Sequence, residues 1–257
     1  MRVLQSALFA LALFVGTLIC LKVGWHFARR RLSGGDGDAT AGLGAVDGAV
    51  FGLMGLLLAF TFTGAAARFD HRRDLIVEEV NAIGTAWLRL DLLQPDARDD
   101  LRVLMRRYVD ERIATYAHVT DETAVRRSLQ RTQEAQVAFW SRLTVALKAE
   151  TSVALVANIV PAVNSMFDIA QTRVLATRQH PPLAVYLMLG LLVLVSSLLA
   201  GFGMAKAPVQ STFHVVAFAA ILSSSIYLIL DMEFPRLGLV RVDKFDQALL
   251  EVRETMN

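Results

Sequence analysis

Four long apolar runs alternate with polar sequence along the chain. They cover about residues 3–24, 46–67, 183–204 and 210–230, and few charged side chains lie within them. An α-helix rises about 1.5 Å per residue, so about 20 apolar residues cross the roughly 30 Å hydrocarbon core of a bilayer. The pattern therefore predicts an all-α membrane protein with four transmembrane spans. A cleaved signal peptide is the alternative for the first run, because Arg2 supplies a short basic start.

A long polar segment separates the second run from the third. Residues 68–181 hold more than half of the charged side chains of the chain. This concentration of charge predicts a helical extramembrane domain inserted between spans 2 and 3. Residues 1–67 then carry spans 1 and 2, residues 182–232 carry spans 3 and 4, and residues 233–257 form a C-terminal tail.

The second apolar run continues into the polar domain without a proline, which predicts one long helix from about Gly48 to Leu93. Apolar residues recur every seven positions along its second half, and such a repeat forms a seam for packing on other helices. The members of this seam are Phe62, Phe69, Ile76, Ile83 and Leu90, with Val80 and Trp87 between them.

Three more helices are predicted in the domain. Pro95 is followed by acidic residues, which is typical of a first helical turn. A further helix covers about residues 121–148. Thr151–Phe167 is uncharged, but polar residues and Pro161 interrupt it. We therefore expect a buried or interfacial helix there, and no fifth span.

Small residues repeat along one face of the second span. Gly44, Gly48 and Gly52 are four residues apart, and Gly55 and Ala59 continue the same face. In a membrane, such a face lets the backbone of a neighbouring helix approach closely. We expect tight helix packing at this face; a ligand site is the alternative.

Composition and motifs exclude several classes of function. The chain has 257 residues, 54% of them hydrophobic, and a formal net charge of +2, which does not predict a nucleic-acid partner. Cys20 is the single cysteine, so there is no internal disulfide framework. The five histidines lack the spacing of metal ligands, and no motif of a known enzyme class occurs. We expect no catalytic residues, no cofactor and no metal site.

Several stretches together resemble a bacterial family described as having a bestrophin-like domain, and the likeness runs in order along nearly the whole chain. They are Leu58-Ala59-Phe60-Thr61-Phe62-Thr63-Gly64 with Arg68-Phe69, Glu78-Glu79-Val80-Asn81-Ala82-Ile83-Gly84, Arg107-Tyr108-Val109-Asp110-Glu111-Arg112, Asn164-Ser165-Met166-Phe167-Asp168 with Arg173, and Leu230-Asp231-Met232-Glu233-Phe234-Pro235 with Gly238. Bestrophins are pentameric anion channels with four spans per subunit, and their second helix lines a pore narrowed by hydrophobic residues.

The resemblance implies that the second span lines a pore here as well. Phe51, Phe60 and Phe62 would then be candidates for a constriction, and the hydroxyl groups of Thr61 and Thr63 could donate to an anion. Each residue turns the direction of a helix by about 100°, so at most one of Phe60 and Phe62 faces a lumen. Aromatic packing between spans is the alternative for each phenylalanine.

Polar residues of the domain form a candidate network. Glu78 and Asn81 lie on the long helix, and Asn164, Asp168 and Arg173 lie on a later one. Such a network would fix the register of the helical bundle; alternatively, it would guard a cytoplasmic pore mouth, with Arg173 attracting anions. At the end of the last span, we expect Asp231 and Glu233 to pair with an arginine instead of binding an ion.

Two functions remain for this architecture. The first is a homo-oligomeric pore that passes small anions, with the lipid bilayer and further copies of the chain as partners. The alternative is a non-conducting membrane scaffold or sensor whose helical domain binds a protein. Arg29, Arg30 and Arg31 would place the first loop in the cytoplasm, but basic residues near the span ends are more numerous on the side of the domain. The positive-inside rule therefore predicts a multi-pass protein of the plasma (inner) membrane with a cytoplasmic domain.

Overall fold

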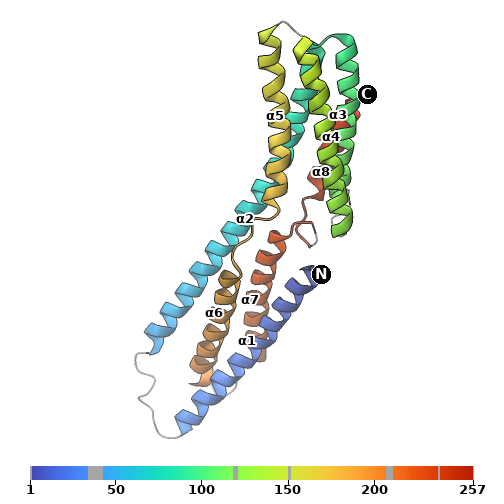
Figure 1. Cartoon of the computed structure of the whole chain (residues 1–257). Coiled ribbons are helices and arrows are strands. Elements are labelled where there is room, and N and C mark those ends of the chain that lie inside the picture. Colours follow the sequence, from blue (N-terminus) through green and yellow to red (C-terminus); the bar gives the residue numbers. More distant parts are fainter. Residues whose placement is uncertain are drawn as a thin grey trace. The chain divides into compact units, whose positions relative to one another are not determined.

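The computed structural model describes residues 2–33, 43–117, 121–149, 152–206, 211–236 and 238–256. Within these ranges every regular element is helical, which confirms the predicted all-α class. The helices are α1 (Arg2–Ser33), α2 (Leu43–Arg89), α3 (Pro95–Ala117), α4 (Glu122–Ala149), α5 (Val153–Ala176), α6 (Leu183–Gly203), α7 (Thr212–Glu233) and α8 (Asp243–Glu254), with the short 3-10 turns η1 (Leu90–Leu92) and η2 (Met204–Lys206) (Figure 1).

The chain forms two compact units. Unit 1 consists of Met1–Phe69 and His180–Val240, and unit 2 consists of Asp70–Gln179 and Arg241–Asn257. Helix α2 contributes its apolar half to unit 1 and its polar half to unit 2. The last helix, α8, belongs to unit 2, although the sequence placed it in a tail.

In unit 1, α1 packs along α6 and α7, and two glycines lie where α1 and α6 come close together. A Cβ added at Gly24 would lie 2.0 Å from the carbonyl oxygen of Leu198, and one at Gly201 would lie 2.1 Å from the carbonyl oxygen of Leu21. Only glycine fits where two backbones come this near. The close packing of α1 on α6 therefore depends on these two positions.

The small-residue face of α2 packs differently. A Cβ added at Gly44, Gly48, Gly52 or Gly55 would meet no heavy atom within 4 Å among the described residues outside the helix itself. The predicted tight packing at this face is therefore not made among the residues that the structure describes. It stays a prediction for contact with another chain.

Unit 2 is a helical bundle with its own apolar core. The predicted seam of α2 is confirmed for Ile76, Ile83 and Leu90, which are each at most 1% exposed. It is wrong for Phe62, which is 44% exposed. Ile83 and Leu90 pack with side chains of α3, α4 and α5, and Phe167 contacts the rings of Tyr108 and Phe139 edge-on, at centroid distances of 5.4 and 6.0 Å. Further members of the core are Leu101, Met105, Leu143, Ile159, Val163, Met166 and Leu249.

Five helices among the described residues are long and apolar enough to cross a membrane. They are α1, α6 and α7 in unit 1, α5 in unit 2, and α2, whose apolar half lies in unit 1. Helix α5 continues through Pro161, and its buried face joins the core shared with the polar helices α3 and α4. Length and composition therefore do not confirm the predicted count of four spans, because α5 is also long and apolar enough to be one. It stays a prediction, which the packing of α5 among polar helices favours.

Candidate functional site

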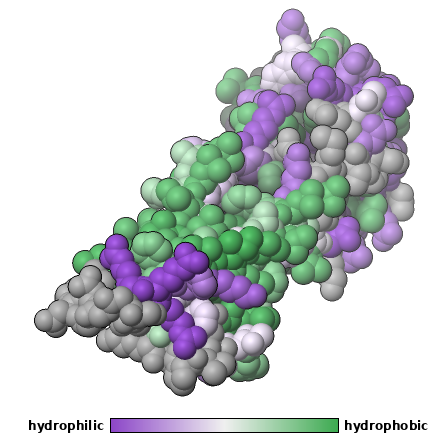
Figure 2. Space-filling model, turned by 90° about the horizontal axis from the view of Figure 1, so that it is seen from below, coloured by the Kyte–Doolittle hydropathy of each residue, from purple (hydrophilic) through white to green (hydrophobic). Residues whose placement is uncertain are grey.

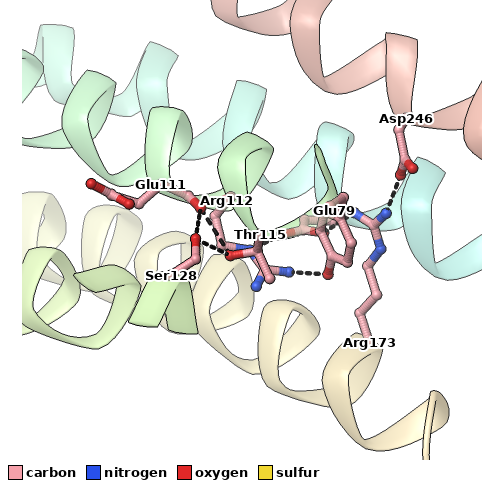
Figure 3. Close-up of polar contacts among 8 residues, drawn as sticks. Glu79, Glu111, Arg112, Thr115, Ser128, Arg173 and Asp246 are labelled. Atoms are coloured by element: carbon pink, nitrogen blue, oxygen red, sulfur yellow. Dashed lines mark hydrogen bonds and ion pairs between the residues drawn. The ribbon is translucent and has the colours of Figure 1, made fainter. Parts of the chain in front are cut away.

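A cluster of buried charges joins four helices of unit 2. Glu79 of α2 accepts hydrogen bonds from Arg112 Nε of α3 and from Arg173 Nη1 of α5, both at 2.5 Å. Arg173 also donates to Asp246 of α8, and Arg112 donates to the hydroxyl of Tyr116 at 2.7 Å. The four charged side chains converge from separate helices (Figure 3). We call these five residues the Glu79 network.

The Glu79 network is almost closed to solvent and electrically balanced. Glu79 is 0% exposed, Arg112 1% and Arg173 4%. Burial alone would raise the pKa of Glu79, but the two guanidinium groups hold it below its ordinary value of 4.5. Burial alone would lower the pKa of Arg112, yet Tyr116 and Glu79 raise it. Glu79, Arg112 and Arg173 therefore stay ionised near neutral pH. The network as a whole sets two acidic side chains against two arginines.

The fifth helix of unit 2, α4, is tied to α3 beside this network. The hydroxyl groups of Thr115 and Ser128 are 2.9 Å apart, and Ser128 also donates to the backbone oxygen of Glu111 at 3.2 Å (Figure 3). Buried polar groups cost stability unless they are paired, so these contacts fix one register for all five helices.

The predicted polar network and the observed one share only Arg173. The other predicted members have exposed side chains: Glu78, Asn81, Asn164 and Asp168. The carboxylate that meets Arg173 belongs to Glu79, one residue further along α2. One feature of the sequence could have identified Glu79 as the buried carboxylate. It lies three residues after Ile76 and four before Ile83, so it places a charge on the apolar seam of the helix.

A second cluster of charges lies in unit 1, at the C-terminal end of α7. Glu233 is 1% exposed; it accepts hydrogen bonds from Arg68, including one from Nε at 2.9 Å, and lies 3.3 Å from His180 Nδ1. The ring of His180 packs on Phe234 at 4.8 Å. The prediction that an arginine pairs with Glu233 is confirmed.

Asp231, the other acidic residue at this end of α7, makes a different contact. Its carboxylate accepts a hydrogen bond from the backbone nitrogen of Val240 at 2.7 Å. A Cβ at Gly238 would lie 1.6 Å from the same carboxylate, so only glycine fits there. Asp231 therefore fastens the segment that follows α7.

The candidate pore-lining residues lie on the apolar half of α2. Phe60 is 64% exposed and Phe62 44%, and Thr63 is exposed as well. Phe51 is partly buried against the core of unit 1. Thr61 donates to backbone oxygens of its own helix, at 2.7 Å to Leu57 and 3.0 Å to Leu58. The hydroxyl hydrogen of Thr61 is thus already engaged in a hydrogen bond. Among the described residues, the structure gives no such partner for the hydroxyl of Thr63.

The charged groups of both clusters are arranged for structure and not for chemistry. The carboxylates of Glu79 and Glu233 are each matched by arginine, and no group of three or more His, Cys, Asp or Glu side chains could hold a metal ion in the described part of the chain. What the clusters can do is hold helix ends and helix registers in place.

Comparisons with known proteins agree on one family. A family model described as "Bestrophin-like domain" matches residues 7–245. Among solved structures, a mutant of a bacterial bestrophin homologue from Klebsiella pneumoniae superposes with a TM-score of 0.66 at 17% identity, covering 93% of this chain and 98% of that one. No curated protein sequence matches significantly. The structural likeness shows a shared fold, and because the family model covers nearly the whole chain, the protein belongs to the bestrophin-like family.

Proposed function

We propose that the chain assembles into a homo-oligomeric membrane channel for small anions, with α2 lining the pathway. The observation that carries this proposal is the exposure of α2. Only 11% of its most apolar window is buried, compared with 22% for α1, 28% for α6 and 39% for α7. Membership of the bestrophin-like family supports the same proposal.

The residue types on the exposed part of α2 favour contact with protein over contact with lipid alone. Glycine within a helix costs roughly 0.5–1 kcal/mol relative to alanine. Gly44, Gly48, Gly52 and Gly55 leave one face flat, and no described part of the chain covers it. A lipid-facing surface gains nothing from such flatness, whereas a second helix can approach its backbone closely. A further copy of this chain is the occupant that an oligomer would supply.

The aromatic residues of α2 lie on two different sides of the helix. Phe60 and Phe62 differ by about 200° around its axis, since each residue turns by about 100°. Phe62 shares the side of the glycines, seven residues after Gly55, and Phe60 does not. In an assembled ring one of these sides meets the neighbouring subunit while the other is free to narrow the lumen. A hydrophobic side chain there would gate by excluding water.

Halide flux into proteoliposomes tests the proposal. The native chain is compared with Phe60→Ala and Phe62→Ala, and with Phe213→Ala as a matched control. Phe213 is 78% exposed at the start of α7, so its truncation removes the same atoms away from α2. We expect flux above that of empty liposomes, a several-fold change on truncation of one α2 phenylalanine, and no change in the control.

Each outcome points to one arrangement. A change confined to Phe60→Ala or to Phe62→Ala identifies the side of α2 that faces the lumen. If neither substitution changes the flux, the pathway is not lined by these two side chains of α2. No flux from a protein shown to be folded and inserted, or a monomeric particle in mild detergent, would contradict the channel and favour the scaffold. The proposal keeps unit 2 in the cytoplasm, as the distribution of basic residues predicts.

A further inference from the structure

The C-terminal end of α1 carries a stripe of basic side chains that the channel proposal does not use. Lys22, His26 and Arg30 are spaced by four, so they share one face of the helix, and all three are exposed. Next to them, Val23 and Phe27 form an apolar stripe with exposed fractions of 52% and 54%. We call these five residues the α1 basic stripe and its apolar border.

The stripe and its border line a shallow surface hollow. Its volume is about 480 Å³, and Trp25 completes the lining. Two more arginines stand over its aromatic rings, Arg29 at 4.7 Å from the centroid of Trp25 and Arg31 at 5.1 Å from that of Phe27. Figure 2 shows hydrophilic surface directly beside hydrophobic surface on the unit that contains α1.

The segment that carries the stripe contains no acidic side chain of its own. Residues 22–31 contain five basic side chains and no acidic one. The structure gives Lys22, His26 and Arg30 no hydrogen-bond or ion-pair partner among the residues it describes. Arginines near the other end of the spans are engaged by the protein itself: Arg68 binds Glu233, and Arg72 donates to the backbone oxygens of Ala176 and Gln179, at 3.2 and 2.9 Å.

We propose that the α1 basic stripe binds the phosphate headgroup of an anionic phospholipid, whose acyl chain lies along Val23 and Phe27. Basic groups at the end of a span reach the headgroup layer while their stems stay in the apolar region. Aromatic rings favour the same depth. Cationic groups attract negative headgroups at the surface, and an acyl chain covers an apolar border that would otherwise face water. The two parallel stripes match the two halves of one phospholipid.

Lipid retention measured by native mass spectrometry tests this assignment. The full chain, purified in mild detergent, is mixed with phosphatidylglycerol or with phosphatidylcholine of the same acyl chains. The test variant is Lys22→Gln/Arg30→Gln. The control, Arg107→Gln/Lys148→Gln, removes the same charge from two exposed positions in unit 2.

We expect the native chain and the control to retain phosphatidylglycerol over phosphatidylcholine. The test variant should lose about tenfold or more of that preference, because each basic group near the surface contributes about a factor of five. On the native chain, raising the ammonium acetate concentration from about 0.1 to about 1 M should weaken the preference without any substitution.

Three results would overturn the assignment. The first is equal retention of the two lipids by the native chain. The second is an unchanged preference for phosphatidylglycerol in a folded test variant, and the third is a preference that does not change with the salt concentration. A further arm adds inorganic phosphate at millimolar concentration. Displacement of the lipid by phosphate would show that the stripe binds the free anion, and persistence of the lipid would support binding of the whole phospholipid.

Discussion

Neutralising Glu79 is the sharpest test of how unit 2 is held together. The substitution Glu79→Gln keeps the size of the side chain and removes its charge. Arg173 would then keep Asp246, whereas Arg112 would keep only the hydroxyl of Tyr116, and the network would lose one negative charge. Because Glu79 is 0% exposed, water cannot replace the lost carboxylate.

The magnitude follows from burial. Removing one partner of a buried ion pair costs about 3–5 kcal/mol, because the other charge remains buried without compensation. For a domain of this size we expect the melting temperature of unit 2 to fall by roughly 10 °C or more. Asp110→Asn is the matched control. It also neutralises a carboxylate bound to an arginine, Arg253, but Asp110 is 54% exposed, so its loss should cost at most about 1 kcal/mol.

Tryptophan fluorescence can isolate unit 2 within the full chain. Trp87 and Trp140 lie in unit 2, and Trp25 lies in unit 1. In a Trp25→Phe background, the fluorescence melting curve therefore reports unit 2 alone. Each variant is measured in this background, in the same detergent.

Two results would refute the reasoning. A loss below about 1 kcal/mol for Glu79→Gln, no larger than for Asp110→Asn, would mean that the Glu79 network does not stabilise the fold. The double variant Glu79→Gln/Arg112→Met should lose less stability than the sum of the single variants, because it removes an uncompensated charge. Strict additivity would show that the charges act independently.

Further predictions follow from the same structure. The pKa of Glu79 in the folded state lies below 4.5, so its contribution to the stability of unit 2 is present above that pH and is lost as the pH falls further. Between about pH 5 and pH 3, the melting temperature should therefore fall more steeply in the native chain than in Glu79→Gln. Gly201→Ala would place a Cβ 2.1 Å from a backbone oxygen of α1, so it should destabilise unit 1 by about 1–3 kcal/mol or more in a thermal melt. Gly203→Ala is the control: a Cβ there has no neighbour within 4 Å among the described residues, so its effect should be nearly neutral. Gly238→Ala would collide with the carboxylate of Asp231 and should expose the segment after α7 to proteolysis; an unchanged digestion pattern would contradict this contact.

Local patterns in the sequence predicted the elements well. The seven-residue repeat of α2 identified the buried Ile76 and Ile83, and Pro95 marked the first residue of α3. Both features depend on neighbours in sequence, through helical spacing and the missing amide hydrogen of proline. The end of α7 was also predictable, because an acidic residue at a span end needs a cation.

The long-range features were harder to predict. The partners of Glu79 are 33 and 94 residues away, and nothing near Glu79 indicates which arginines will meet it. Glu78 and Asn81, three residues apart, share a polar face of α2, and that face is exposed. The uncovered glycines of α2 show a second limit. A small-residue face indicates that something approaches closely, but not whether that helix belongs to the same chain.

The position of α8 has a consequence for the order of events during synthesis. Helices α2 to α5 leave the ribosome before α6 and α7, and α8 follows them, yet Asp246 of α8 is needed to balance Arg173 of α5. Until α8 is made, the half-built bundle carries a guanidinium group that lacks one of its two carboxylates. Unit 2 can therefore complete its bundle only after α6 and α7 of unit 1 have been synthesised. A completed unit 2 thus indicates a chain in which both of these helices have already been translated.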